Sequence, residues 1–175
     1  MPPDLTFENL VEAYYKDLYR FAYSLTHSEF DAADLVQETF YTWAIKGHQL
    51  RDDANVKSWL FTSLHRLFLQ IVRKQTRFPH QELDETVSDL PAPDPAAIQS
   101  MDSRTLMESI GRIEENYRAP LVLYYMEDLA YKEIANILEI PLGTVQSRIS
   151  RGKAMLYTLL TRGPSSRGIA GGADE

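Results

Sequence analysis

Five polar and basic side chains near the C-terminus share one face of an expected helix. They are Gln146, Ser147, Arg148, Ser150 and Arg151. Arginine can grip the edge of guanine with two hydrogen bonds, glutamine can pair with adenine, and serine can hold phosphate. No acid occurs between residues 141 and 172 to repel DNA. The set predicts a helix that reads base edges in the major groove, and the alternative from these residues alone is the solvated face of an ordinary surface helix.

The neighbouring residues fit a helix-turn-helix. Ile134 and Leu138 supply the apolar side of a first helix at residues 131–138, and Ala135 is small enough to admit a close crossing. A second helix, at residues 144–160, has apolar positions that face back toward the first at spacings of four, three and four: Val145, Ile149, Gly152 and Leu156. Three further residues complete the candidate DNA-binding set: Lys132, Thr144 and Lys153.

Apolar periodicity along the rest of the chain predicts an all-α fold. Helical spacing indicates helices at residues 6–27, at residues 28–47 and from residue 56. Thr6 and Ser28 are the expected N-caps of the first two. Helical signals resume near residue 101 and again behind Pro120, which a first helical turn tolerates. No strand alternation, internal repeat or phosphate-binding glycine motif appears.

A proline-rich acidic segment divides these helices into two small domains. Residues 78–98 lack periodicity and contain four prolines among acids and small residues, a pattern typical of an extended linker. We therefore expect an N-terminal domain at residues 6–77, a flexible linker at 78–98 and a C-terminal domain at 99–161. The tail at residues 162–175 is rich in Gly and Ser and is expected to be disordered.

The helix that starts near residue 56 carries more apolar surface than one amphipathic helix needs. Outside its inner stripe it presents Trp59, Phe61, Phe68, Leu69 and Val72. The stretch from residue 54 to 81 contains no acid, but it contains Lys57, Arg66, Arg73, Lys74 and Arg77. With the acidic linker after it and the acid-free helix near the C-terminus, charge is segregated into basic, acidic and basic blocks.

The composition excludes several classes of protein. The chain of 175 residues has no cysteine, which excludes disulfides, thiol catalysis and cysteine-ligated zinc. Its net charge of −7 argues against indiscriminate adhesion to nucleic acid. It lacks an export signal and an apolar stretch long enough to span a bilayer, so we expect a cytoplasmic protein without membrane insertion. No nucleophile with a base, metal-ligand spacing or nucleotide loop appears, so we expect no enzyme and no cofactor.

Three motifs, in order along the chain, resemble the extracytoplasmic-function (ECF) RNA polymerase sigma factors. Residues 131–135 (Tyr-Lys-Glu-Ile-Ala) and 143–148 (Gly-Thr-Val-Gln-Ser-Arg) resemble the promoter-reading helix-turn-helix of that family. Residues 31–40, followed by Trp43, resemble its polymerase-binding helix, and residues 56–77 resemble its promoter-melting segment. The resemblance covers residues 7–160 and implies a region 2 helical bundle followed by a region 4 helix-turn-helix.

The resemblance implies roles for both N-terminal motifs. A polar, acidic strip on one face of the second helix would bind core RNA polymerase; its residues are Asp34, Gln37, Glu38 and Tyr41. The clamp and flap regions of the polymerase are the contacts that the resemblance implies. Capping and solvation of an ordinary helix is the alternative for this strip. In the melting segment the five basic residues would hold phosphates of the −10 element, while Phe61, His65 or the loop before residue 56 would contact flipped bases. The alternative is that Trp59, Phe61 and Phe68 are core residues.

The function that follows is a sigma factor of the minimal two-domain type. It would open the −10 element and read the −35 element, and its partners would be core RNA polymerase, double-stranded promoter DNA and the melted non-template strand. Whether an anti-sigma factor restrains it is left open. Two other classes remain: a dimeric helix-turn-helix regulator, and a sigma-mimicking protein that titrates an anti-sigma factor.

Four residues depart from the family pattern. Gln146 stands where many relatives have arginine or lysine, and Arg66 stands where an asparagine is common. Asp128 and Glu139 occupy turn positions where glycine is frequent, and a left-handed backbone at either would cost roughly 1 kcal/mol.

Overall fold

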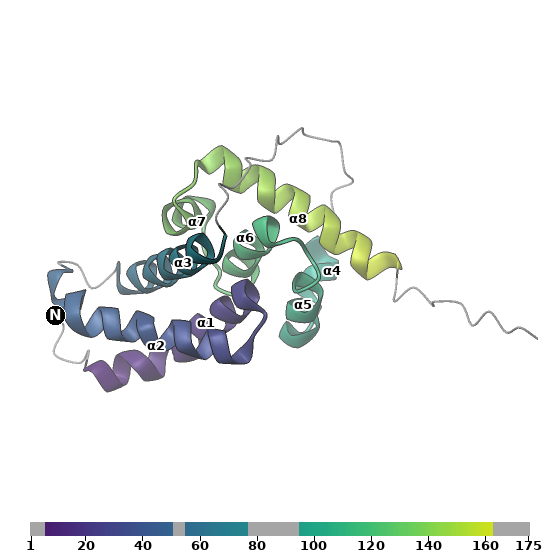
Figure 1. Cartoon of the computed structure of the whole chain (residues 1–175). Coiled ribbons are helices and arrows are strands. Elements are labelled where there is room, and N and C mark those ends of the chain that lie inside the picture. Colours follow the sequence, from purple (N-terminus) through teal and green to yellow (C-terminus); the bar gives the residue numbers. More distant parts are fainter. Residues whose placement is uncertain (1–5, 51–54, 77–94, 163–175) are drawn as a thin grey trace, which may run out of the picture.

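The computed structural model describes residues 6–50, 55–76 and 95–162, and every regular element in those ranges is a helix (Figure 1). The elements are α1 (Phe7–Thr26), α2 (Glu29–Lys46), η1 (Gly47–Gln49), α3 (Val56–Gln75), α4 (Pro95–Gln99), α5 (Ser103–Ile110), α6 (Glu115–Tyr125), α7 (Tyr131–Leu138) and α8 (Leu142–Arg162). The predicted all-α fold is confirmed. Arg77, residues 78–94 of the expected linker and residues 163–175 of the expected tail lie outside the described residues.

The first two helices begin at the expected N-caps. The Thr6 side chain accepts a hydrogen bond from the Asn9 N–H at 3.3 Å, and the Ser28 side chain accepts one from the Asp31 N–H at 3.2 Å. Each bond satisfies one of the amides that a helix start leaves without a helical partner. Between the two helices the chain reverses at His27, which is left-handed with φ of 53°.

α6 begins earlier than expected. The prediction that Pro120 lies in a first turn is wrong, because α6 starts at Glu115 and Pro120 lies inside it. Proline has no N–H to donate to the carbonyl of Asn116 one turn earlier. Asn116 is exposed, so water reaches this turn, while Pro120 itself is buried. The ring therefore packs in the core at the cost of one hydrogen bond near the helix start.

Four residues at the end of the expected linker belong to the folded part of the chain. The short helix α4 covers residues 95–99, and Ile98 within it is buried. The lapse of periodicity and the prolines among acids predicted a linker to residue 98, but Pro95 stands at the first position of α4, where its missing N–H costs nothing.

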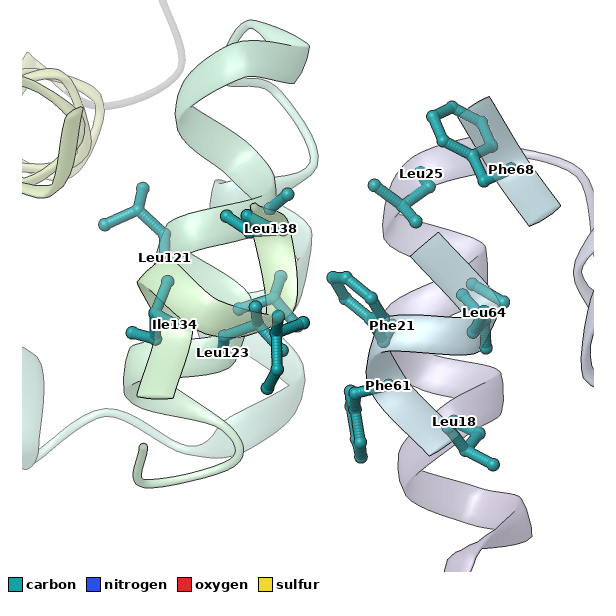
Figure 2. Close-up of a cluster of buried hydrophobic side chains, with 14 of the residues drawn as sticks. Leu18, Phe21, Leu25, Phe61, Leu64, Phe68, Leu121, Leu123, Ile134 and Leu138 are labelled. Carbon is teal, nitrogen blue, oxygen red and sulfur yellow. The ribbon is translucent and has the colours of Figure 1, made fainter. Parts of the chain in front are cut away.

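The two helical units share one hydrophobic core, which the sequence did not predict. α1 packs against α6 and α3 packs against α7, so that α3 lies between α7 and the α1–α2 pair (Figure 1). Figure 2 shows the two groups of buried side chains: Leu18, Phe21, Leu25, Phe61, Leu64 and Phe68 from the N-terminal unit, and Leu121, Leu123, Ile134 and Leu138 from the C-terminal unit. Phe21 points from α1 toward the second group. Of the surplus apolar residues of α3, Trp59 packs against Trp43 of α2 and Phe61 against Phe21 of α1, so part of that surface belongs to this core.

Candidate functional site

The four residues of the acidic strip line one groove. Asp34, Gln37, Glu38 and Tyr41 are all exposed on α2, and together they form one wall of a groove of about 740 Å³. The opposite wall is the C-terminal half of α3, including Phe68, Ile71 and Lys74. Ile71 is exposed although it is apolar. The groove therefore combines acidic groups on one side with apolar groups and one lysine on the other, a surface that suits a basic, amphipathic protein helix.

The basic residues of α3 divide into two groups. Arg73 and Lys74 are exposed at the C-terminal end of the helix. Lys57 and Arg66, by contrast, form ion pairs with acids of the C-terminal unit. Phe61 is fully buried and packs on Phe21, with ring centroids 5.5 Å apart. In this arrangement Phe61 is a core residue, as the alternative interpretation had it, and offers no surface to a flipped base.

A buried carboxylate, Glu127, joins the turn between α6 and α7 to the N-terminal unit. Its side chain is 1% exposed, and its oxygens lie 3.5 Å from Lys57 Nζ and 3.6 Å from Arg20 Nε. The Lys57 ammonium also donates to the Glu127 carbonyl at 3.2 Å. Burial raises the pKa of the Glu127 carboxyl and nearby Asp17 adds to the rise, whereas Arg20 and Lys57 oppose it. The buried charge is thus held by two cations from α1 and α3.

A second ion pair joins the turn between α7 and α8 to α3. Arg66 presents its guanidinium to both oxygens of Glu139, with Nε 3.1 Å and 3.2 Å from them and Nη2 in closer contact with Oε1. The hydrogen bond from Arg66 lowers the pKa of Glu139. Glu139 has φ of 55°, so the left-handed turn considered from the sequence is present here and also at Asp128. This turn aims the carboxylate at α3.

His65 lies beside this pair and is largely buried. Burial lowers the pKa of His65 to about 4, Glu139 opposes the fall and Arg148 adds to it. Its Nδ1 atom is buried without a hydrogen-bond partner. The ring faces Phe21 at a centroid distance of 6.4 Å. His65 is therefore a neutral residue of the contact between the two units, and the structure gives it little exposed surface.

α8 carries most of the candidate DNA-binding residues on its N-terminal half. Gln146 and Ser150 are exposed and Ser147, Arg148 and Arg151 are half-buried, while Lys132 is exposed on α7. Thr144 is half-buried in the first turn of α8, whose N-terminus contains no acid. Lys153 departs from the set, because its ammonium lies 4.5 Å from the centre of the Tyr124 ring in a cation–π contact.

Arg118 is a buried residue of the contact that was not predicted from the sequence. Its Nε and Nη2 atoms donate to the Ile113 carbonyl at 3.0 Å and 2.9 Å, and Nη1 donates to the Ser24 carbonyl at 2.6 Å. Ser24 stands in the last turn of α1, where carbonyls lack helical partners. The available signal was an isolated cation next to the apolar run at residues 119–123, a residue type that is rarely buried unless it is hydrogen-bonded.

Comparisons with known proteins identify the family. Sigma-70 region 2 matches residues 10–78, and Sigma-70 region 4 matches residues 103–156. The ECF RNA polymerase sigma factor SigM of Bacillus subtilis is 31% identical over 91% of this chain and 98% of its own length. The chain belongs to the ECF RNA polymerase sigma factors. SigE of Mycolicibacterium smegmatis is also similar, at 35% identity over 90% of this sigma factor, which spans 62% of SigE.

The fold agrees with that membership. A solved structure of the sigma factor RpoE in complex with the anti-sigma factor NepR, from Bartonella quintana, matches this sigma factor with a TM-score of 0.67 and 29% identity. The match covers 89% of this chain and 96% of that one. Among the described residues, no helix is both long and apolar enough to cross a bilayer, and no group of three or more acidic or histidine side chains is placed to hold a metal ion. As a sigma factor, the protein directs core RNA polymerase to promoters.

Proposed function

We propose that the two units divide the work of promoter recognition. The α2 wall of the groove binds core RNA polymerase, α3 and the residues that follow it grip and open the −10 element, and the N-terminal half of α8 reads the −35 element. The domain boundaries at residues 6–77 and 99–161, the second extended by α4 to residue 95, belong to this proposal. The observation that carries it is the placement of the four strip residues along one groove wall on α2, which lies across the molecule from α8 and its arginines (Figure 1).

The rest of the assignment concerns catalysis, location and a third partner. We propose that this chain makes and breaks no bond, so that catalysis belongs to the polymerase and the protein acts in the cytoplasm where transcription occurs. RpoE of Bartonella quintana is described in complex with an anti-sigma factor, and a comparable restraining protein is a fitting third partner.

Polymerase binding is tested by changing the groove. Gln37→Ala with Glu38→Ala removes two exposed side chains from the groove wall, and we expect affinity for core RNA polymerase to fall at least about tenfold. The matched control is Asn9→Ala with Glu12→Ala, which also removes one amide and one carboxylate, from exposed residues of α1 outside the groove. The affinity of each variant is measured by its binding to surface-immobilised core RNA polymerase. Equal affinities of the groove variant and the control would refute the assignment.

Promoter reading is tested on α8. Arg148→Ala with Arg151→Ala is expected to abolish transcription from promoters that depend on this protein, because each bidentate arginine contributes about 1–3 kcal/mol of base discrimination. The control is Arg162→Ala, at the far end of the same helix. Retention of promoter-specific transcription by the double variant would refute the role of α8.

A further inference from the structure

Two acids at opposite ends of α7 hold two cations of α3. Glu127 precedes α7 and pairs with Lys57, while Glu139 follows α7 and pairs with Arg66. Both cations lie on α3, nine residues apart, which is about 13 Å along a helix axis. α7 therefore lies alongside α3 in the same direction, with one ion pair at each end.

These two acids form ion pairs with cations that, in the proposed function, bind phosphates of the −10 element. A carboxylate presents to lysine or arginine the same charge-assisted acceptors as a phosphate, and a guanidinium can bind either group with two hydrogen bonds. Phe61 and His65, which lie between Lys57 and Arg66 along α3, are covered in the same arrangement. While α7 is packed there, Phe61 is out of reach of DNA, and a phosphate can bind Lys57 or Arg66 only by displacing a carboxylate.

We infer that the packing of α7 on α3 is an autoinhibitory contact, in which Glu127 and Glu139 take the places of −10 phosphates on Lys57 and Arg66. The inference rests on the proposed function, since it requires α3 to bind the melted strand. The free protein keeps α3 closed, and the two units must separate before α3 can engage DNA.

The composition of the contact makes it reversible. The Arg66 and Glu139 side chains are 58% and 47% exposed, so water and salt compete with that pair. Glu127 is buried, and burial raises the pKa of its carboxyl in spite of two nearby cations. Separation of the units therefore returns the Glu127 charge to water, which offsets part of the loss of its ion pairs.

The contact is tested by removing the acids from the full-length chain. Glu127→Gln with Glu139→Gln keeps the shape of both side chains and changes the net charge from −7 to −5. Glu8→Gln with Glu12→Gln makes the same change in charge on exposed residues of α1 and serves as the control. Because the chain has no cysteine, dyes can be attached at Ala44→Cys on α2 and Thr161→Cys on α8 to follow the distance between the units.

We expect the double variant Glu127→Gln with Glu139→Gln to show a longer distance between the dyes than the control. It should also bind a fluorescent oligothymidylate at least about threefold more tightly, because apparent affinity scales with the fraction of open molecules. Adding Lys57→Ala and Arg66→Ala should cancel the gain. An unchanged distance, or a gain that survives loss of both cations, would overturn the inference.

A second variant guards against misfolding. Glu139→Gly removes one acid and also relieves the left-handed backbone, so it should open the contact without weakening the turn. Asp128→Gly relieves the same kind of strain at a residue that forms neither ion pair and is the control. If the units open in either acid variant but oligothymidylate binding does not rise, α3 does not bind the strand, and both the −10 assignment and the inhibition fail. If the distance between the dyes is unchanged while transcription by polymerase still depends on the −10 element, the autoinhibition is refuted and the −10 assignment stands.

Discussion

Arg118 and Glu127 are the two charged side chains that the contact between the units buries most deeply among the described residues. Arg118 donates three hydrogen bonds to two carbonyls, one of them Ser24 at the end of α1. Glu127 has cations nearby, but its Oε1 atom is 3.6 Å from Arg20 and has no hydrogen-bond partner. At 3.6 Å the contact is electrostatic and not a hydrogen bond. Arg118 therefore stabilises the contact through hydrogen bonds, whereas the buried charge of Glu127 depends on the nearby cations Arg20 and Lys57.

Arg118→Met should destabilise the protein. The change keeps an apolar stem of similar length but leaves the Ile113 and Ser24 carbonyls without their buried donor, which costs about 2–4 kcal/mol for two acceptors. Chemical denaturation measured by circular dichroism gives the free energy of unfolding. Arg112→Met, at a less buried position in the preceding turn, is the control and should change that energy by less than about 0.5 kcal/mol. Equal losses in the two variants would contradict this role.

His65 makes stability depend on pH. Its pKa is about 4 in the folded protein and 6.5 as the ordinary value, so between these pH values the unfolded chain binds the proton more strongly. Stability is therefore lost as pH falls from 6.5 toward 4, by at most about 3 kcal/mol. His65→Gln should remove this part of the loss. Because His27 and Glu127 titrate in both proteins, the test is the difference between the two stability curves, and parallel curves would refute the assignment.

At the scale of helices, close packing sets where glycine is needed. A Cβ atom built on Gly152 of α8 would lie 2.8 Å from the Leu121 side chain of α6, closer than real contacts allow. A Cβ on Gly143, in the first turn of the same helix, meets nothing within 4 Å. α8 therefore crosses α6 at Gly152. Helical spacing in the sequence had placed this face against the first helix of the helix-turn-helix and did not identify α6 as a partner.

The two glycines make a matched pair of variants. Gly152→Ala should lower the free energy of unfolding by about 1–3 kcal/mol, because α6 and α8 must move apart or Leu121 must leave its rotamer. Gly143→Ala should be neutral or stabilising by up to about 1 kcal/mol, since alanine favours the helix. Thermal unfolding of both variants gives the comparison. A stabilising Gly152→Ala would show that the crossing has room that this structure does not have.

The sequence predicted helix ends correctly where side chains close to the end determine it. The N-caps at Thr6 and Ser28 and the bounds of α7 follow from side chains within a few residues of each helix end. The start of α6 was missed because proline is common in a first turn, and nothing in the periodicity shows that helix can precede Pro120. Pairs such as Lys57 with Glu127, which are 70 residues apart, leave no local pattern at all.

At the scale of the whole molecule, the surplus apolar surface of α3 has a different cause from the one that the sequence suggested. Phe61 lies in the shared core, and α7 packs along α3. Part of this surface was expected to meet melted bases, since periodicity identifies an apolar face without identifying what covers it. Both uses are compatible only if the units separate, so under the proposed autoinhibition the same face would be core in the closed protein and a DNA-binding surface in the open one.

The closed arrangement predicts how DNA binding by the free protein responds to salt. With Lys57 and Arg66 held in ion pairs and Lys153 over Tyr124, the phosphate contacts that the proposed reading unit makes with duplex DNA fall chiefly to Lys132, Arg148 and Arg151 on α7 and α8, so this binding should be weak. Its logarithmic salt slope should be about −3, at roughly −0.9 for each phosphate contacted.

An opened protein should show a steeper slope on the right DNA. On a duplex with a premelted bubble, Glu127→Gln with Glu139→Gln frees Lys57 and Arg66 and should steepen the slope by roughly 1.4 to 1.8 relative to the wild type. Fluorescence anisotropy titrations at several salt concentrations measure both slopes, and the same pair of proteins on a fully paired duplex is the control. Equal slopes on the bubble would mean that breaking the two ion pairs adds no phosphate contact, and in that case the ion pairs across α7 exert no control over binding.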